Sequence, residues 1–441
     1  MELQLKGKKI LFGTVPADGH FNPLTGLAVF LKQQGCDVRW YTSPIFKEKL
    51  DRLNIQHYPF VKALDVTGNN LQEVFPERND IKDAAAKLEF DLINVFGDRA
   101  TEYFEDIKDI YQTFEFDLMI GDSFFSVLPF VKHKLNVPII AIGIVPLAED
   151  SVDLAPYGMG FLPPGNDAER NEYANLRALV KTAIFKNSID RFSATLDEYH
   201  IPHEKSIIFD LLIRQADFYL QIGSPGFEYG RSDVGGNVRY VGALLPAVSK
   251  SSDKVWFDER VKHYTKIVLV TQGTVERDTS KLIVPVLEAL KDTDVLVIAT
   301  TAGHDTAELR QMFPHQNLIV EDYIPYNTIM PFVDLYITNG GYSGTLLSIK
   351  HRLPILAAGL YEGKNEICSR IGYFNIGINL NTETPEPQQI TEAVEELLTD
   401  PMYKRNVENL ANELGSYDSN TLCAAYINEL IGERADIRAG I

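Results

Sequence analysis

One histidine and one aspartate stand where a parallel sheet would place reactive side chains. His20 lies in the loop at 16–21, directly after the apolar run at 8–15. A neutral imidazole in such a loop can act as the general base that removes a proton from a hydroxyl. Asp122 belongs to a second apolar run, at 116–124. If the two loops adjoin, its carboxylate accepts from the other ring nitrogen and orients the base. Taken singly, a backbone-bonded histidine and a solvated or capping aspartate are the ordinary alternatives.

A glycine-rich segment offers a different chemistry, the binding of an anion. The sequence NGGYSGT at 339–345 follows an apolar run and precedes residues with helical spacing. Two adjacent glycines let the backbone approach a ligand closely, and free N–H groups at a helix start attract negative charge. A phosphate or diphosphate fits this turn, although it matches neither GxxxxGK[ST] nor GxGxxG. A plain tight turn is the alternative, and the motif alone does not decide between the two.

The elements that must position these residues alternate between strands and helices. Strands are expected at 8–15 and 37–43. Between them, Asn22 can cap a helix whose first position is Pro23 and which ends at Gly35. These elements form one βαβ unit, which indicates a parallel sheet. Further strands of the first half are expected at 116–124 and 137–145.

The same alternation restarts in the second half, so the chain is predicted to contain two successive α/β lobes. Ligands of open parallel sheets bind outside the carboxyl ends of the strands, which favours residues directly after strands as functional candidates. These candidates are His20, Asp122, Thr274, Tyr323 and the turn at 339–345. The second-half strands are expected at 265–274, 294–301, 318–325, 335–341 and 353–359, and the helices at 280–290 and 345–352.

Composition shifts suggest where the lobes divide. The stretch PAVSKSSDKV at 246–255 is polar and composed like a linker. We therefore expect an N-terminal domain at 1–245, a linker at 246–260 and a C-terminal domain at 261–420. The last helix, 421–441, is expected to pack back on the N-terminal domain.

Charge and cysteine content exclude several classes of partner. The 441 residues include 42 Lys and Arg against 61 Asp and Glu, a net charge of −19. Non-specific DNA binding and anionic-membrane binding both need a basic face, so neither partner is expected. Cys36, Cys368 and Cys423 lie far apart, which argues against a disulfide framework or structural zinc and for a reducing compartment. The sequence has no signal-peptide pattern and no long apolar run, so we expect a cytoplasmic protein with no membrane span. We expect this protein to be a monomer or a homodimer.

Taken together, these motifs resemble the family-1 glycosyltransferases, which include UDP-sugar-dependent transferases of the bacterial macrolide and flavonoid type. The resemblance rests on the GHxxP loop at 19–23, the later Asp122, the YIPY segment at 323–326 and the NGG turn at 339–341. These motifs keep the family's order and spacing over nearly the whole chain. The resemblance implies the GT-B fold, in which two Rossmann-like, doubly wound parallel-sheet lobes face each other across a cleft.

The resemblance also implies a mechanism. The acceptor hydroxyl binds the N-terminal lobe, His20 removes its proton with support from Asp122, and the oxygen attacks the anomeric carbon with inversion. The C-terminal lobe holds the nucleotide, with Tyr323 stacked on the base and Thr274 at the phosphates. No metal is implied, because helix N-termini and hydroxyls neutralise the leaving group. No cofactor is implied beyond the nucleotide-sugar co-substrate, a UDP-sugar.

Two further sets of candidate site residues are predicted, one for the acceptor and one for the donor. The acceptor-side candidates are apolar, and they form a hydrophobic pocket if they face the cleft or belong to the core if they do not; they are Phe21, Phe124, Phe125, Val145 and Phe161. The donor-side candidates lie in the first loop, at strand ends of the second lobe and in the glycine turn. They are Gly19, Gly273, Thr274, Tyr323, Ile324, Tyr326, Asn339, Gly340, Gly341, Ser343, Gly344, Thr345, Glu362, Gly363 and Lys364.

Several donor positions depart from the family's pattern. Asn339 replaces a histidine that reaches the diphosphate, and its amide can still donate a hydrogen bond. Leu347 replaces the glutamate that binds the ribose hydroxyls, which leaves room for dTDP-sugars because they lack one hydroxyl. Residues 363–364 replace the Asp-Gln pair that holds the sugar. Glu362 or Glu366 is then the candidate carboxylate for that role.

The sequence therefore predicts an inverting glycosyltransferase that moves a sugar, expected to be glucose, from UDP to a hydroxyl of a hydrophobic small molecule such as a flavonoid or polyketide. A dTDP-sugar donor is one alternative. A non-catalytic GT-B homologue that binds a nucleotide or a lipophilic ligand is another. The altered donor positions favour this second alternative, and the His20–Asp122 pair opposes it. A nucleotide-sugar epimerase of the same fold is opposed by the resemblance in the acceptor lobe.

Overall fold

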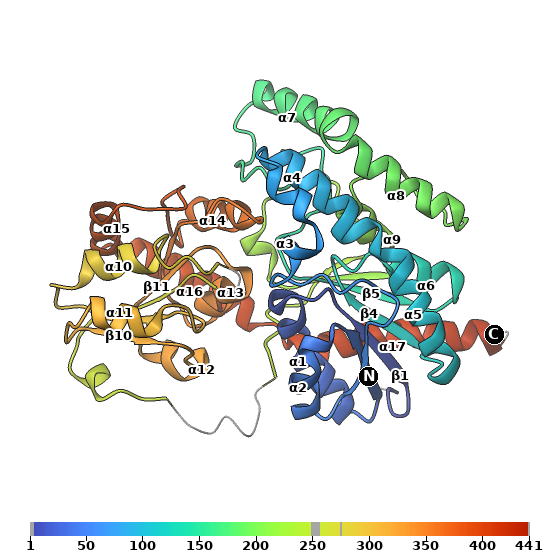
Figure 1. Cartoon of the computed structure of the whole chain (residues 1–441), viewed down its shortest axis with the longest axis horizontal. Coiled ribbons are helices and arrows are strands. Elements are labelled where there is room, and N and C mark those ends of the chain that lie inside the picture. The colour runs from blue at the N-terminus through green and yellow to red at the C-terminus, as the bar shows by residue number, and fades with distance from the viewer. Residues whose placement is uncertain (1–3, 248–255, 274–275, 440–441) are drawn as a thin grey trace.

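The structure is a computed structural model that describes residues 4–247, 256–273 and 276–439, with side chains described as far as residue 432. Two α/β lobes lie side by side, each built on a parallel sheet (Figure 1). The N-terminal sheet has the order β3-β2-β1-β4-β5-β6-β7. Its strands are β1 (Lys9–Gly13), β2 (Asp37–Thr42), β3 (Gln56–Pro59), β4 (Leu118–Asp122), β5 (Ile139–Gly143), β6 (Phe218–Gln221) and β7 (Val238–Tyr240).

The second sheet has six strands in the order β10-β9-β8-β11-β12-β13. All of its pairings are parallel, so its carboxyl ends lie at one edge. Both sheets reverse their strand order beside the first strand, which is where open α/β sheets bind ligands. The strands are β8 (Ile267–Thr271), β9 (Leu296–Thr300), β10 (Leu318–Glu321), β11 (Leu335–Thr338), β12 (Ile355–Ala357) and β13 (Gly377–Asn379).

Helices connect successive strands in both lobes. In the first lobe they are α1 (Asp18–Gln33), α2 (Lys47–Arg52), α3 (Leu71–Val74), α4 (Ala84–Asp91), α5 (Arg99–Thr113), α6 (Leu128–Lys134), α7 (Asp167–Leu179), α8 (Lys186–Glu198) and α9 (Ile208–Gln215). The later helices are α10 (Ile283–Leu290), α11 (Thr306–Met312), α12 (Tyr326–Ile329), α13 (Tyr342–Lys350), α14 (Lys364–Tyr373), α15 (Pro387–Thr399), α16 (Pro401–Gly415) and α17 (Ser419–Ala439).

Burial on both faces explains why the strands are almost continuously apolar. In β1, Ile10 and Phe12 enter one hydrophobic cluster while Leu11 enters another on the opposite face. In β8, Leu269 and Val270 divide between two clusters in the same way. Each sheet is therefore covered by helices on both sides, which is the doubly wound α/β architecture that the sequence predicts.

The first helix begins earlier than the sequence predicts. The expected start was Pro23, but α1 begins at Asp18 because the amides of His20 and Phe21 both donate to the Ala17 carbonyl. Pro23 sits inside the helix, where it leaves the Gly19 carbonyl without its usual i+4 partner. The correction matters for the site, since His20 is fixed in the first turn of a helix rather than in a free loop.

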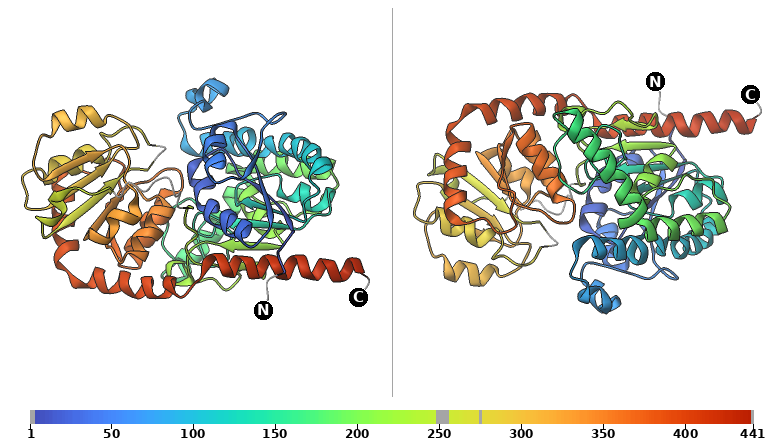
Figure 2. Two further views of the ribbon diagram at one scale, coloured as in Figure 1. Left: turned by 90° about the horizontal axis from the view of Figure 1, so that it is seen from below. Right: turned by 90° about the horizontal axis from the view of Figure 1, so that it is seen from above.

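The last helix, α17, lies along the N-terminal lobe although it follows the second lobe in sequence (Figure 2). The Gln4 amide donates to Asn428 Oδ1 at 2.7 Å, and the rings of Phe218 and Tyr426 lie 5.4 Å apart. Helix α17 also contacts α1, which carries His20. Most of the expected linker at 246–260 cannot be compared, because residues 248–255 are outside the described part of the chain.

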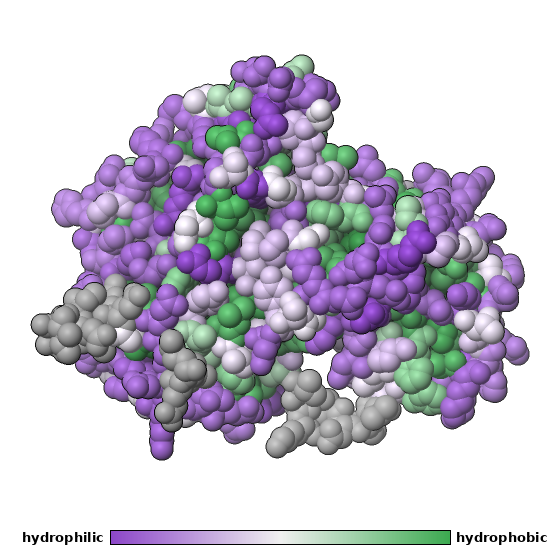
Figure 3. All heavy atoms as spheres, turned by 180° about the vertical axis from the view of Figure 1, so that it is seen from behind, coloured by the Kyte–Doolittle hydropathy of each residue, from purple (hydrophilic) through white to green (hydrophobic). Residues whose placement is uncertain are grey.

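The surface agrees with the acidic, polar composition. On the face seen in Figure 3, hydrophilic residues cover most of the surface and the hydrophobic ones form separate patches. Over the described ranges, no helix is long and apolar enough to cross a membrane.

Packing of α17 makes a measurable prediction for stability. Ile427 is fully buried in the cluster that includes the core face of α1. We expect Ile427→Ala to lower the free energy of unfolding by about 2–5 kcal/mol, because it removes buried methyl groups and leaves a cavity. Glu429→Ala, at an exposed position of the same helix, is the matched control. Thermal unfolding with equal midpoints for the two variants would contradict this packing.

Candidate active site

The Asp122 carboxylate joins the ends of two central strands to the first turn of α1. Asp122 is fully buried at the end of β4. Its Oδ2 accepts from the Val15 amide at 2.9 Å, and its Oδ1 accepts from the Phe124 amide at 2.8 Å. The same Oδ1 lies 2.9 Å from Nδ1 of His20. The strand order β2-β1-β4 makes these neighbours possible, because it places the loop after β1 beside the loop after β4.

This contact fixes how the imidazole is presented. Because the carboxylate can only accept, Nδ1 of His20 carries the proton in the neutral ring and Nε2 is the basic nitrogen. Within the described ranges, no side chain or backbone group hydrogen-bonds to Nε2. The side chain is 17% exposed, so Nε2 remains accessible while the ring is held. This arrangement suits a general base.

An aromatic wall stands beside the histidine. Phe124 lies 5.0 Å from the His20 ring, centroid to centroid, and stacks on Phe209 at 4.0 Å. Phe96 packs edge-on against both of these phenylalanines. Of the acceptor-side candidates, Phe124 thus lies where a flat apolar molecule would contact both the ring and the base.

The other acceptor-side candidates divide between the core and the surface. Phe21 is fully buried against Trp40 and Phe46, and Phe125 is fully buried among other aromatic rings. The predicted acceptor role of these two residues is wrong for this arrangement, because they have no free surface. Val145 is partly buried, and its carbonyl is bonded to Gln221. Phe161 is 43% exposed and lies far along the chain from the His20 loop.

In the second lobe, Tyr323 presents an open aromatic face. It is 70% exposed, and its hydroxyl donates to the Ala302 carbonyl at 2.9 Å, which anchors the ring at the end of β10. Ile324 points into the core, so its side chain cannot contact a ligand. Tyr326 directs its hydroxyl to Thr300 Oγ1 at 3.0 Å and supports the sheet edge. Burial raises the pKa of the Tyr326 phenol, so it stays protonated.

The glycine turn forms the start of α13. Gly341 caps the helix in extended conformation, and Gly340 has φ +94°, a left-handed value that favours glycine. Asn339 is 7% exposed, and its Nδ2 donates to the Gln272 carbonyl. One of its two amide hydrogens is therefore already used, which leaves one for a ligand.

The remaining residues of the turn complete its shape. Thr345 is buried, and its hydroxyl donates to the Gly341 carbonyl at 3.0 Å. Gly344 lies against Tyr336, whose hydroxyl would be 2.6 Å from an added Cβ, while Ser343 is exposed. Leu347 packs against the core, as expected of a side chain that cannot bind ribose hydroxyls.

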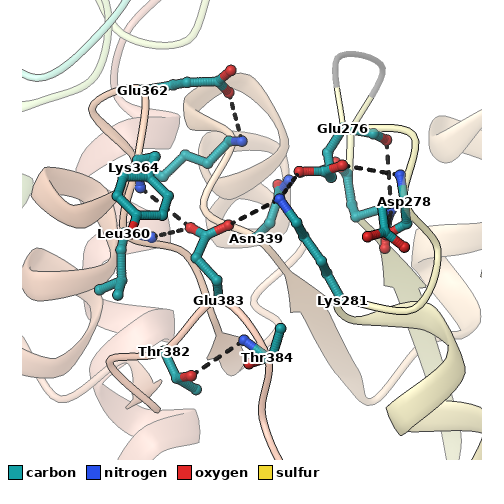
Figure 4. Close-up of polar contacts among 12 residues, drawn as sticks. Glu276, Asp278, Lys281, Asn339, Leu360, Glu362, Lys364, Thr382, Glu383 and Thr384 are labelled. Carbon is teal, nitrogen blue, oxygen red and sulfur yellow. Dashed lines mark hydrogen bonds and ion pairs between the residues drawn. The ribbon is translucent and has the colours of Figure 1, made fainter. Parts of the chain in front are cut away.

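Charged side chains surround this turn (Figure 4). Lys281 pairs with Glu276 and lies 3.8 Å from Glu383, and Glu383 accepts the amides of Leu360 and Tyr361. Burial alone would raise the pKa of Glu276, but its hydrogen bonds with Lys281 and the Asp278 amide, together with the charges of Lys281 and Lys364, outweigh burial and lower that pKa. The sequence analysis missed Lys281 and Glu383, since no motif surrounds either residue.

The candidate sugar loop lies beside these charges. Glu362 and Gly363 both have left-handed backbone, with φ +58° and +75°, and they lead into α14. Lys364 Nζ is 2.7 Å from the exposed Glu362 carboxylate, and the Lys364 side chain is only 14% exposed. Glu366 is buried and bonded elsewhere, so it is not free to hold a sugar.

Three donor-side candidates remain. Gly19 is exposed in the first turn of α1, next to His20. Gly273 follows β8 with φ +78°, and its amide donates to Thr271 Oγ1. Thr274 lies outside the described residues.

Metal-ligating residues and cysteine thiols are two further groups that could carry chemistry. Within the part of the chain that the structure describes, no group of three or more His, Cys, Asp or Glu could hold a metal ion. The three cysteines are free and buried. Burial raises the pKa of Cys36 to about 11 and that of Cys368 to about 12, so both thiols are protonated and unreactive at neutral pH.

The chain is similar in sequence to one protein family and to several named proteins. The family described as "UDP-glucoronosyl and UDP-glucosyl transferase" matches residues 213–413. The chain is 29% identical to 4'-demethylrebeccamycin synthase of Lentzea aerocolonigenes over 414 residues, which cover 94% of this chain and 97% of that protein. It is also 29% identical to UDP-glycosyltransferase 2 of Phaeomoniella chlamydospora, with 96% and 95% covered.

Solved structures share the fold. The glycotransferase of kitacinnamycin superposes with a TM-score of 0.75 at 18% identity, covering 97% of this chain and all of that one. The calicheamicin glycosyltransferase CalG4 gives a TM-score of 0.75 at 15% identity, with 97% and 98% covered. The two-lobed GT-B fold expected from the sequence is therefore confirmed.

The glycine turn makes a prediction that needs no ligand. A Cβ at Gly340 would lie 2.7 Å from Cys368 Sγ and 3.1 Å from the Lys364 carbonyl, whereas a Cβ at Gly341 meets nothing within 4 Å. We expect Gly340→Ala to destabilise the protein by about 1–3 kcal/mol, because it adds steric overlap to a left-handed backbone. Gly341→Ala should leave the unfolding midpoint nearly unchanged. Similar midpoints for both variants in calorimetry would show that the turn is packed differently.

Proposed function

We propose, on the premise that the chain is a UDP-glycosyltransferase of family 1 with the GT-B fold, that it transfers glucose from UDP-glucose to a hydroxyl group of a hydrophobic small molecule, with inversion. The observation that carries this proposal is the His20–Asp122 hydrogen bond, 2.9 Å long, beside the Phe124–Phe209 stack. A protein that only bound nucleotides would not need an oriented base next to an apolar wall.

The reaction follows from these positions. The acceptor lies against Phe124, and Nε2 of His20 takes the hydroxyl proton as the oxygen attacks the anomeric carbon. The new bond between acceptor oxygen and carbon forms while the bond between carbon and the diphosphate oxygen breaks. Asp122 stabilises the imidazolium that results, since its carboxylate stays bonded to Nδ1.

The leaving group is a nucleoside diphosphate, and the second lobe offers it complementary groups. The open face of Tyr323 suits stacking on the base. The N-terminus of α13 and its flanking glycines suit the diphosphate, because unpaired amides and the helix dipole favour negative charge. Lys281 and Lys364 add positive charge near the same turn in an otherwise acidic chain.

The choice of nucleotide and sugar is supported by the relatives rather than by the geometry of the site. UDP is favoured by relatives with UDP in their names, among them UDP-glucosyltransferase 1 of Beauveria bassiana, which also supports glucose. The glycosyltransferase VinC was solved with dTDP, has a TM-score of 0.68 and supports dTDP as the alternative. Leu347 is compatible with either nucleotide, because it makes no polar contact with a ribose.

The proposed role of His20 as the general base can be tested by substitution. His20→Ala should lower kcat for sugar transfer by about 10²–10⁴-fold, the range typical of general-base catalysis, without weakening UDP binding. His133→Ala, which removes an exposed histidine of the same lobe, should transfer sugar like the wild type. The measurement is initial-rate kinetics with a panel of phenolic and polyketide acceptors. Undiminished turnover by His20→Ala would refute the assignment.

The identity of the bound nucleotide can be tested by thermal stabilisation. At one hundred times its Kd, UDP should stabilise the protein by about 2.7 kcal/mol, a shift of several degrees that GDP and ADP should not reproduce. A larger shift with dTDP than with UDP would favour the alternative donor. No shift with any nucleotide would favour a non-catalytic protein.

Tyr323 provides a variant for the same assay. Tyr323→Ala should weaken UDP binding by about 10-fold, since stacking on a base contributes about 1–3 kcal/mol. Phe332→Ala removes another exposed aromatic of this lobe and serves as the control. Equal affinities in titration calorimetry would place the base elsewhere.

A further inference from the structure

A buried arginine connects the two lobes. Arg370 of α14 is only 1% exposed. Its Nε and Nη2 donate to Glu228 Oε2 at 3.2 and 3.0 Å, and its Nη1 donates to Glu366 Oε2 at 2.9 Å. Glu228 follows β6 in the N-terminal lobe, whereas Glu366 lies one helical turn before Arg370. The guanidinium is thus shared between the lobes.

The second oxygen of each carboxylate is also used. Glu228 Oε1 accepts from the Leu147 amide at 2.9 Å. Glu366 Oε1 accepts from the amides of Gly158 and Gly160 at 2.8 and 2.9 Å. Arg370 also lies 4.2 Å over the Tyr229 ring. Every carboxylate oxygen of this group therefore has a donor, as buried charges require.

The loop that contains these glycines is held on α14 by two more hydrogen bonds. Asn365 Nδ2 donates to the Gly158 carbonyl and Ser369 Oγ donates to the Gly160 carbonyl, each at 2.6 Å. Residues 365 and 369, like 366 and 370, are one turn apart and share a helix face. We call this set of contacts the inter-lobe clasp; it comprises Gly158, Gly160, Glu228, Asn365, Glu366, Ser369 and Arg370.

The clasp lies between the two substrate sides. Helix α14 begins directly after Glu362 and Gly363, the candidate sugar loop. From the other lobe, the Tyr157 hydroxyl would lie 3.8 Å from a Cβ added at Gly363. The same loop of the N-terminal lobe continues into Phe161, an acceptor-side candidate. The clasp therefore ties the candidate sugar loop to a loop of the N-terminal lobe.

Energetics indicate what such a clasp contributes. Replacing buried ion pairs by apolar side chains is often neutral or stabilising, so holding the lobes together does not require them. Directional hydrogen bonds, in contrast, specify one geometry. Arg370 has two glutamate partners, and Glu366 has three donors, so a shift of α14 against loop 156–161 would break several bonds at once.

We propose that Glu366 and Arg370 are positioning residues for sugar transfer, which hold the loop at 360–364 in register with the N-terminal lobe so that the anomeric carbon faces the acceptor hydroxyl at His20. The inference rests on the proposed transfer of sugar between these lobes. The clasp contains neither Tyr323 nor the turn at 339–341, so its loss should lower kcat by a larger factor than it weakens nucleotide binding.

Gly160 provides the test variant, and Gly236, an exposed glycine of the same lobe outside the clasp, provides the control. Gly160 has left-handed backbone, with φ +67°, whereas Gly236 does not. A Cβ at Gly160 would lie 2.9 Å from the Asn365 side chain, whereas a Cβ at Gly236 meets nothing within 4 Å. Gly160→Ala thus displaces the loop from α14, and Gly236→Ala adds a methyl group to open space. Neither substitution leaves a buried charge unpaired.

We expect Gly160→Ala to lower kcat by about 10–100-fold, as misplacement by an ångström does, with a smaller loss of affinity for UDP. Gly236→Ala should lose less than threefold in kcat. The double variant Asn365→Ala with Ser369→Ala, which cuts the other two bonds, should resemble Gly160→Ala. A kcat like that of the wild type in both Gly160→Ala and the double variant would overturn the proposal.

Hydrogen exchange followed by mass spectrometry gives a readout that does not depend on turnover. Exchange of the amides at 158–160 and 360–364 should rise in Gly160→Ala and remain near the wild-type level in Gly236→Ala. Unchanged exchange at 360–364 in Gly160→Ala would overturn the positioning role by itself. If the wild type transfers no sugar while Gly160→Ala raises exchange at 360–364, the proposed function fails and the mechanical link between the loops stands.

Discussion

Much of the N-terminal half of the site depends on one buried carboxylate. Asp122 has no contact with bulk water, and it accepts from two backbone amides as well as from His20. A buried anion needs several donors, and here the donors come from the end of β1, the first turn of α1 and the loop after β4. The carboxylate thus fixes the histidine and at the same time holds together the strand ends around it.

For the proposed function, the donor side meets the opposite electrostatic problem, since an acidic protein would have to accept a dianionic diphosphate. No arginine or histidine stands in the glycine turn, and the nearby lysines are each held by carboxylates. Positive potential therefore comes mainly from backbone amides at the start of α13, with Lys281 and Lys364 as the neighbouring charges. Asn339 carries no charge, and its side chain donates to the Gln272 carbonyl, which ties the turn to the end of β8.

Sequence reasoning found the features that local patterns encode and missed those that depend on distant partners. The strand ends predicted His20 and Asp122 as candidates at one edge of the sheet, because parallel strands bring their carboxyl ends together, and the structure shows that the two residues are hydrogen-bonded. The preference of proline for the first helical position predicted a start of α1 at Pro23, which is wrong. The helix begins earlier because the Ala17 carbonyl accepts hydrogen bonds from the amides of His20 and Phe21. Phe21 and Phe125 each adjoin a functional residue in sequence yet point into the core. Glu228 and Arg370 are 142 residues apart, so no local pattern in the sequence marks them as partners.

These two groups of buried charges stand in different relations to the fold. Asp122 is bonded within one lobe, so its geometry is complete whenever that lobe is folded. The pair Glu228–Arg370 is complete only when both lobes meet. Burial opposes the positive charge of Arg370, but the two glutamates raise its pKa enough to keep it protonated. If the lobes separated, Arg370 would keep Glu366 but lose Glu228, and water would have to replace that partner. Asp122 therefore holds His20 in place whenever the N-terminal lobe is folded, whereas Glu228 makes the position of α14 depend on the contact between the lobes.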